Sequence, residues 1–213
     1  MRIEYLSKGK PKRLMDQHGK AYESGISKSP AAELTVSAEK VFDDDVANHS
    51  FHGGPDRVLC VYPYEHYNVW KEEFGKELQH AAFGENLTLS GLTEKEVCIG
   101  DQYEIGTVLA EISQGRYPCA TINRHTGINQ LLSRVIETGY TGYFFRVIRP
   151  GVIRNTDCIQ LIKRTTSITV ADIHHTFFHN RRDAAAIQKI LEVQQLAEDW
   201  KGKLRALSKR LED

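Results

Sequence analysis

The sequence predicts a mainly β fold, a barrel or a sandwich, with two inserted helices and a small C-terminal helical domain. Short apolar runs separated by Gly, Pro, Asn and Asp fill the segment 1–165, a spacing typical of all-β proteins. Two stretches within it have helical periodicity. From Thr169 onward, apolar residues recur every three to four positions. We therefore divide the chain into a β domain at 1–165 and a three-helix domain at 166–213.

Seven runs are expected to form strands because they are rich in β-branched and aromatic residues and are bounded by turn residues. They are RIEYLSK (2–8), AELTVS (32–37), RVLCVYP (57–63), LTLSGL (87–92), DQYEIGTVLAEIS (101–113), GYFFRVI (142–148) and DCIQLIKR (157–164).

Two helices are expected to interrupt these strands. The first begins at Pro63, because proline suits the first helical turn, and ends before Gly75. The second follows Thr126, which suits an N-cap, and ends near Gly139.

The C-terminal segment predicts three helices, at about 170–180, 183–191 and 194–212. The segment TVAD at 169–172 has the spacing of a capping box. Since some 45 residues can scarcely bury a stable core alone, these helices should dock on the β domain or on a second copy of the chain, forming a homodimer. The stripe from Trp200 to Leu211 is expected to be core or dimer contact.

The composition is that of a globular protein. Of 213 residues, 40% are hydrophobic and 26% are charged, and 28 Lys and Arg balance 28 Asp and Glu. This balance favours neither a nucleic acid nor a membrane surface as a partner. We expect no signal peptide and no membrane span. Four cysteines without a CxxC motif are typical of reduced thiols, so a cytoplasmic location is expected.

One cysteine has unusual neighbours. Cys119 lies in QGRYPCATINRHTG at 114–127, directly after Pro118 and between Arg116 and Arg124. Proline restricts the backbone, and positive charge lowers a thiol pKa. Cys119 is therefore predicted to be a presented thiolate that could attack an electrophile, carry sulfur or bind a soft metal. The other cysteines lie in apolar contexts typical of core packing: Cys60, Cys98 and Cys158.

Three further polar clusters suggest structural roles. The acids DDD at 43–45 are expected to form a solvated turn, because adjacent like charges repel. Arg146 is opposite in phase to its apolar neighbours, so it could face a cleft or water, and water is expected. His175 and His179 have the spacing of half a zinc site, but HTFFH lacks the glutamate of HExxH, so surface or interface packing is expected.

Several segments occur in an order that resembles a known family. They are FHGGPDRVLCVYPYEHYNVW (51–70), FGENLTLSGLTEKEVCIGD (83–101), EISQGRYPC (111–119), GYFFRVIRPGVI (142–153) and the helical tail SITVADIHHTFFHNRRDAAAIQKILEVQQLAEDW (167–200). Together they resemble the MOSC family of the YiiM type, in which a three-helix domain follows the MOSC domain. The resemblance covers nearly the whole chain.

The resemblance implies a MOSC-type β-barrel that binds the molybdenum cofactor, a molybdopterin, with Cys119 as the protein ligand of the metal. The implied activity is reductive: N-hydroxylated compounds, such as amidoximes and hydroxylamino bases, lose oxygen as water, and a separate flavin or iron–sulfur protein supplies electrons. The sequence departs from the family after the cysteine, in ATINRHTG, which concerns the substrate side of the pocket, and at Thr156, which concerns a turn.

The resemblance also points to groups that could bind the cofactor phosphate. Guanidinium and ammonium groups are strong phosphate donors. The candidates are Lys28 in GISKSP, Arg116 and Arg124.

Other candidates lie in HGGP and FGEN. His52 could hydrogen-bond the pterin or move a proton, or it could be a turn histidine that supports the next strand. Gly53 and Gly54 permit close approach or positive φ. Asn86 could bind a pterin edge or satisfy its own turn.

Two other functions stay open at this point. Cys119 could be a sulfur carrier that holds a persulfide for cofactor or metal–sulfur assembly. Alternatively, the basic loop around it could hold an anion or a small ligand without catalysis.

Overall fold

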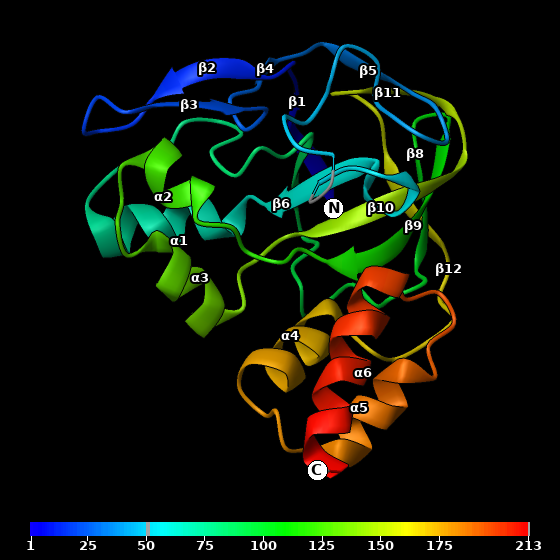
Figure 1. Ribbon diagram of the computed structural model, residues 1–213. Helices are drawn as coiled ribbons and strands as arrows, with labels where there is room; N and C mark the ends of the chain where they lie inside the picture. The colour runs from blue at the N-terminus through cyan, green and yellow to red at the C-terminus, as the bar shows by residue number, and fades with distance from the viewer. Residues whose placement is uncertain (50–51, 213) are drawn as a thin grey trace.

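A computed structural model describes residues 1–49 and 52–212 (Figure 1). The strands are β1 (Arg2–Lys8), β2 (Lys12–Met15), β3 (Ala21–Ser24), β4 (Ser29–Pro30), β5 (Glu33–Val36), β6 (Leu59–Pro63), β7 (Leu87–Ser90), β8 (Gln102–Ile105), β9 (Val108–Gly115), β10 (Tyr143–Arg149), β11 (Gly151–Arg154) and β12 (Ile159–Lys163). The helices are α1 (Glu65–Phe74), α2 (Thr121–Thr126), α3 (Leu131–Thr138), α4 (Val170–Phe178), α5 (Ala184–Leu191) and α6 (Glu198–Glu212), with a 3-10 turn at Pro55–Arg57.

Most strands join one curled sheet. Its order is β12-β8-β9-β10-β6-β7-β1-β4, and β11-β5 and β2-β3 form two small ribbons. Neighbours are antiparallel except β6 and β7, which run parallel and are joined through α1. The sheet is an open half-barrel with β12 and β4 at its edges. Figure 1 shows α1–α3 gathered beside one end of the sheet and α4–α6 grouped below it. The predicted mainly β class is confirmed.

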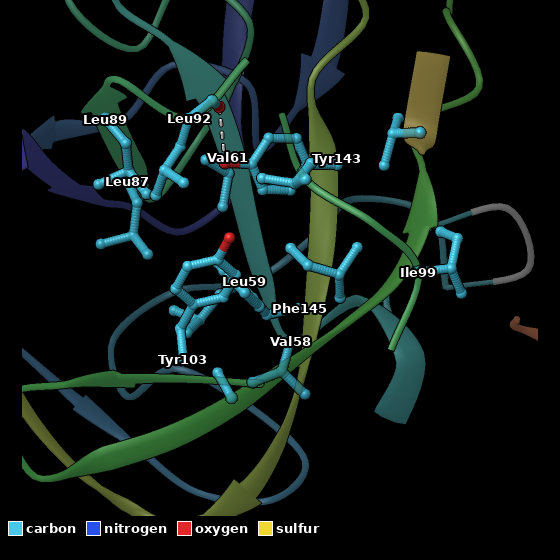
Figure 2. Close-up of a cluster of buried hydrophobic side chains, with 14 of the residues drawn as sticks. Val58, Leu59, Val61, Leu87, Leu89, Leu92, Ile99, Tyr103, Tyr143 and Phe145 are labelled. Carbon is cyan, nitrogen blue, oxygen red and sulfur yellow. Dashed lines mark hydrogen bonds between the residues drawn. The ribbon is translucent and has the colours of Figure 1, made fainter. Parts of the chain in front are cut away.

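The core lies against one face of this sheet. Leu59, Val61 and Phe145 are fully buried in one cluster with residues of β7 and β8 (Figure 2). On the opposite face of β6, Tyr62 belongs to a second cluster under α1 and α3, and Cys60 faces a cavity. Strand β6 is thus buried on both faces, which explains its unbroken apolar run.

The two inserted helices begin later than predicted. Pro63 pairs with Leu89 as the last residue of β6, so α1 begins at Glu65. Thr126 is not an N-cap but the last residue of α2, a helix that was not predicted. Its hydroxyl donates a hydrogen bond to the carbonyl of Ile122. The next helix, α3, begins only at Leu131.

The three C-terminal helices are confirmed. The predicted capping box is present, because Thr169 and Asp172 exchange side-chain and backbone hydrogen bonds at the start of α4. Trp200 and Leu204 of α6 are buried in the same cluster as the sheet core. The helices therefore dock on the β domain of their own chain, and the apolar stripe of α6 is core, although Leu211 is exposed. The homodimer stays a prediction.

Two predictions about single residues are wrong. Arg146 does not simply face water: its side chain is 25% exposed and pairs with Asp56 and Glu111. Cys158 does not pack in the core, because it lies just before the edge strand β12 and is exposed. In the part of the chain that the structure describes, no helix has the length and apolar character needed to cross a membrane.

A buried histidine joins α4 to the loop after α3. His174 is 3% exposed, stacks on Phe178 and, among the described residues, has no hydrogen-bond partner for Nε2. Burial, as the largest cause, lowers the pKa of His174 to about 4. An unfolded histidine titrates near 6.5, so between these values the unfolded chain binds a proton that the folded chain does not.

The free energy of unfolding should therefore fall as the pH is lowered from about 6.5 to about 4, by roughly 3 kcal/mol from this residue alone. His174→Gln should flatten that dependence in urea unfolding experiments. His175→Gln changes an exposed neighbour that lowers the pKa of His174 only as a lesser cause, so it should alter the pH dependence much less. Equal slopes for wild type and His174→Gln would contradict the assignment.

Candidate functional site

A cavity of about 290 Å³ lies beside β6, on the face of the strand opposite the main core. Five segments far apart in the sequence converge on it. They are 23–28, 46–48, 52–57, 83–86 and 116–121, together with Cys60 and Phe144. Phe83 and Phe144 add aromatic walls, while Lys28, Arg57 and Arg116 add positive charge.

Cys119 is presented at this cavity by a short connection between β9 and α2. The backbone N–H of Arg116 donates to the carbonyl of Gly142 at 3.0 Å, which ties the connection to the start of β10. Pro118 is buried and Cys119 is half-buried, with its Sγ 3.2 Å from Thr121 Oγ1. The cysteine is therefore held, yet reachable from the cavity.

The thiol of Cys119 is acidic. A hydrogen bond with His52 is the largest cause, and together with hydrogen bonds from Thr121 it outweighs burial and lowers the pKa of Cys119 to about 6. About nine-tenths of the thiol is then ionised at pH 7. The expected lowering is present, but its source differs from the arginines that the sequence suggested.

The reaction of Cys119 with iodoacetamide should reach half its maximal rate at about pH 6, because the thiolate is the reacting species. His52→Ala should move this midpoint up toward the ordinary value of about 8.5. Peptide-resolved mass spectrometry would follow Cys119 apart from the exposed Cys158. His49→Ala changes an exposed histidine of the same loop and serves as the control. A wild-type midpoint above pH 8 would contradict the assignment.

The two arginines of the cysteine segment lie differently. Arg116 lines the cavity, and its Nη1 is 3.9 Å from Cys60 Sγ, a weak acceptor. Arg124 is not among the lining residues. Its guanidinium instead lies 3.7 Å from Asp16 Oδ2 and packs on the ring of Tyr22.

Lys28 and Asn86 line the cavity but are held in a buried network. Lys28 Nζ donates to both oxygens of Asp44, at 2.7 Å to Oδ1, and the two side chains are only 6% and 10% exposed. Asn86 accepts from the N–H of Cys60 and donates to Asp44 and to the carbonyl of Ser7. Asn86 therefore fixes the cavity wall. The prediction of a fully solvated DDD turn is wrong for Asp44.

The remaining candidates are the two glycines of HGGP, His52 and the histidines of α4. Gly53 and Gly54 both have positive φ, at 81° and 92°, but only Gly53 lines the cavity. His52 is exposed at the cavity mouth. His175 and His179 are exposed on α4 and at its end, and no group of three or more His, Cys, Asp or Glu within the described ranges could hold a metal ion.

Sequence reasoning missed several polar residues at this site, among them Asp44, Thr121 and Arg57. Asp44 was hidden in an acidic run, and Thr121 in a helix that was not predicted. Arg57 follows the HGGP segment, which was itself noticed, and lines the cavity. The charge of Arg57 beside a glycine-rich turn was the available signal.

Comparisons with known proteins agree with this architecture. Residues 48–160 match the MOSC domain, and residues 168–212 match the YiiM-like, 3-alpha helix domain. Protein YflK of Bacillus subtilis (strain 168) is 38% identical over 97% of this chain and 94% of its own. Protein YiiM of Escherichia coli (strain K12) is 34% identical over 85% and 83%. A protein named "Reductase" from Gibberella moniliformis (strain M3125 / FGSC 7600) is 38% identical over 60% of this chain, which is 23% of that protein.

The crystal structure of YiiM from Geobacillus stearothermophilus is similar throughout, with a TM-score of 0.82 and 32% identity over 97% of this chain and 98% of that one. Both domains, in the same order, are thus found in a solved relative. The chain belongs to the MOSC domain family and carries the YiiM-like three-helix domain.

Proposed function

We propose that this protein binds the molybdenum cofactor and reduces N-hydroxylated compounds, such as amidoximes and hydroxylamino bases, with electrons from a separate flavin or iron–sulfur protein. The observation that carries the proposal is an acidic, reachable cysteine at a cavity that the guanidinium of Arg116 also lines. Membership in the MOSC family and the relative named "Reductase" support it.

The residues present fit such a cofactor. A thiolate is a soft ligand suited to a soft metal centre, and Cys119 would be that ligand. Arg116 contacts only a weak sulfur acceptor among the described residues, so its guanidinium could bind a terminal phosphate. Gly53 and Gly84 both have positive φ and both line the cavity. Because glycine has no Cβ, a ligand could approach the backbone closely at these two positions.

The bound cofactor would supply the two-electron chemistry that removes oxygen from an N–OH group. The chain supplies the rest. The His52 imidazole holds Cys119 as a thiolate through its hydrogen bond to Sγ. Lys28 is paired with Asp44, so its role is to hold the cavity wall, and its ammonium group is not free to bind a ligand. Phe83 and Phe144 contribute aromatic rings to the cavity wall.

The test is metal analysis and activity of the wild-type chain from a host that makes the cofactor. We expect about one molybdenum per chain and reduction of benzamidoxime when a flavin reductase and an iron–sulfur or haem carrier supply electrons. Metal-free protein without this activity would contradict the proposal. Activity in the same assay would exclude a non-catalytic binding module as the full account.

The acidic thiol also supports a second candidate, the sulfur carrier, because a thiolate attacks a persulfide donor readily. Incubation with a cysteine desulfurase and cysteine should then add one sulfur to Cys119, visible by mass spectrometry. If no adduct forms on Cys119, this candidate is removed and the reductase proposal is unaffected.

A further inference from the structure

The first turn of α6 contacts two of the segments that lead to the cavity. In the segment that follows His52, Arg57 pairs with Asp199, with 2.9 Å between Nη2 and Oδ2. Arg57 lines the cavity and ends the 3-10 turn that follows Gly53 and Gly54. The C-terminal domain thereby holds the segment that carries His52.

The same turn holds the strand that leads to Cys119. Trp200, the residue after Asp199, donates from Nε1 to the carbonyl of Gly115 at 2.7 Å, and this bond is buried. The N–H of Ala197 donates to the carbonyl of Ser113 at 3.0 Å. A buried hydrogen bond with good geometry fixes its partner within a few tenths of an ångström. The end of β9 is therefore fastened to α6 just before the cysteine connection begins.

The connection itself also packs on the helical domain. The ring of Tyr117 lies 5.5 Å from Phe178 and 6.2 Å from Trp200, centroid to centroid. Lys203 Nζ lies 5.4 Å from the centroid of the same ring. Tyr117 is two residues before Cys119, so the packing of α4 and α6 extends to within two residues of the cysteine.

We propose that the first turn of α6 positions Cys119 relative to His52, which makes the three-helix domain part of the framework of the site. Asp199 and Trp200 are positioning residues, since neither lines the cavity. Cys119 and His52 line the same cavity from segments far apart in the sequence, so their relative position depends on contacts that hold both segments. The proposal does not depend on the cofactor, because it concerns the placement of these two segments.

The test uses the full-length chain and measures hydrogen exchange at two backbone amides that are hydrogen-bonded in the segments held by α6. In Asp199→Asn, the amide of Arg57 should exchange about tenfold faster than in wild type, because its segment has lost the contact with α6. Trp200→Phe keeps a ring and removes the bond to β9, and it should speed exchange at the amide of Arg116 to a similar extent.

Glu198→Gln is the matched control. Glu198 precedes Asp199, lies on the surface of the same turn and pairs with Lys201 and Arg205. Its loss removes comparable ion pairs and should leave exchange at both amides unchanged. Circular dichroism and thermal unfolding identify variants that keep the fold. Folded Asp199→Asn and Trp200→Phe proteins whose two amides exchange as in wild type would overturn the proposal, and this result would leave the molybdenum assay of the wild-type chain unaffected.

Discussion

Cys119→Ser is expected to abolish amidoxime reduction and to remove molybdenum from protein purified from a cofactor-competent host. A serine hydroxyl stays protonated at neutral pH and is a poor ligand for a soft metal, whereas the Cys119 pKa of about 6 leaves the sulfur ionised. The loss should exceed the roughly 10–100-fold that removal of an outer-shell partner costs. Metal content by mass spectrometry and turnover with benzamidoxime would measure it.

The control for this change is Cys158→Ser. Cys158 is exposed beside β12 and does not line the cavity. The control should therefore keep both the metal and the activity. Because Cys119 is only half-buried, its replacement should change the thermal midpoint little. A Cys119→Ser protein that retains molybdenum and turnover would show that this sulfur is not the ligand.

Local sequence patterns predicted the fold where burial follows a simple period. Strand β1 lies at the predicted residues, and the other six strand-like runs each contain one strand or more. The ribbon β2-β3 was missed because its strands are short and largely exposed, so their sequence carries no apolar alternation. Helix α2 was missed because it has six residues and buries only Ile122 and Thr126.

The site could be predicted in part for a related reason. Proline and glycine impose local backbone geometry, so Cys119 and Gly53 were visible from their immediate neighbours. Arg124 shows the limit of this reasoning. It is only five residues from Cys119 in the sequence, but its side chain points toward Asp16. Partners such as Asp44 for Lys28, or Asp199 for Arg57, depend on how loops fold back, and no local pattern reports that.

The largest effect on stability is expected from Asp44→Ala. Asp44 accepts hydrogen bonds from Lys28 Nζ, from Asn86 Nδ2 at 3.0 Å and from the backbone N–H of Gly9 at 2.8 Å. Its removal leaves Lys28, whose side chain is 6% exposed, without its counter-charge. Breaking a buried pair from one side costs about 3–5 kcal/mol, because the remaining charge stays desolvated.

Urea unfolding of Asp44→Ala and Asp45→Ala would measure this difference within one acidic run. Asp45 has a side chain that is 51% exposed and pairs with His49 on the surface, so its loss should cost less than about 1 kcal/mol. Lys28→Met combined with Asp44→Leu should recover part of the stability, since no charge is then buried alone. Equal unfolding midpoints for the two single variants would mean that Lys28 does not depend on Asp44, and that wall of the cavity would have to be held by other contacts.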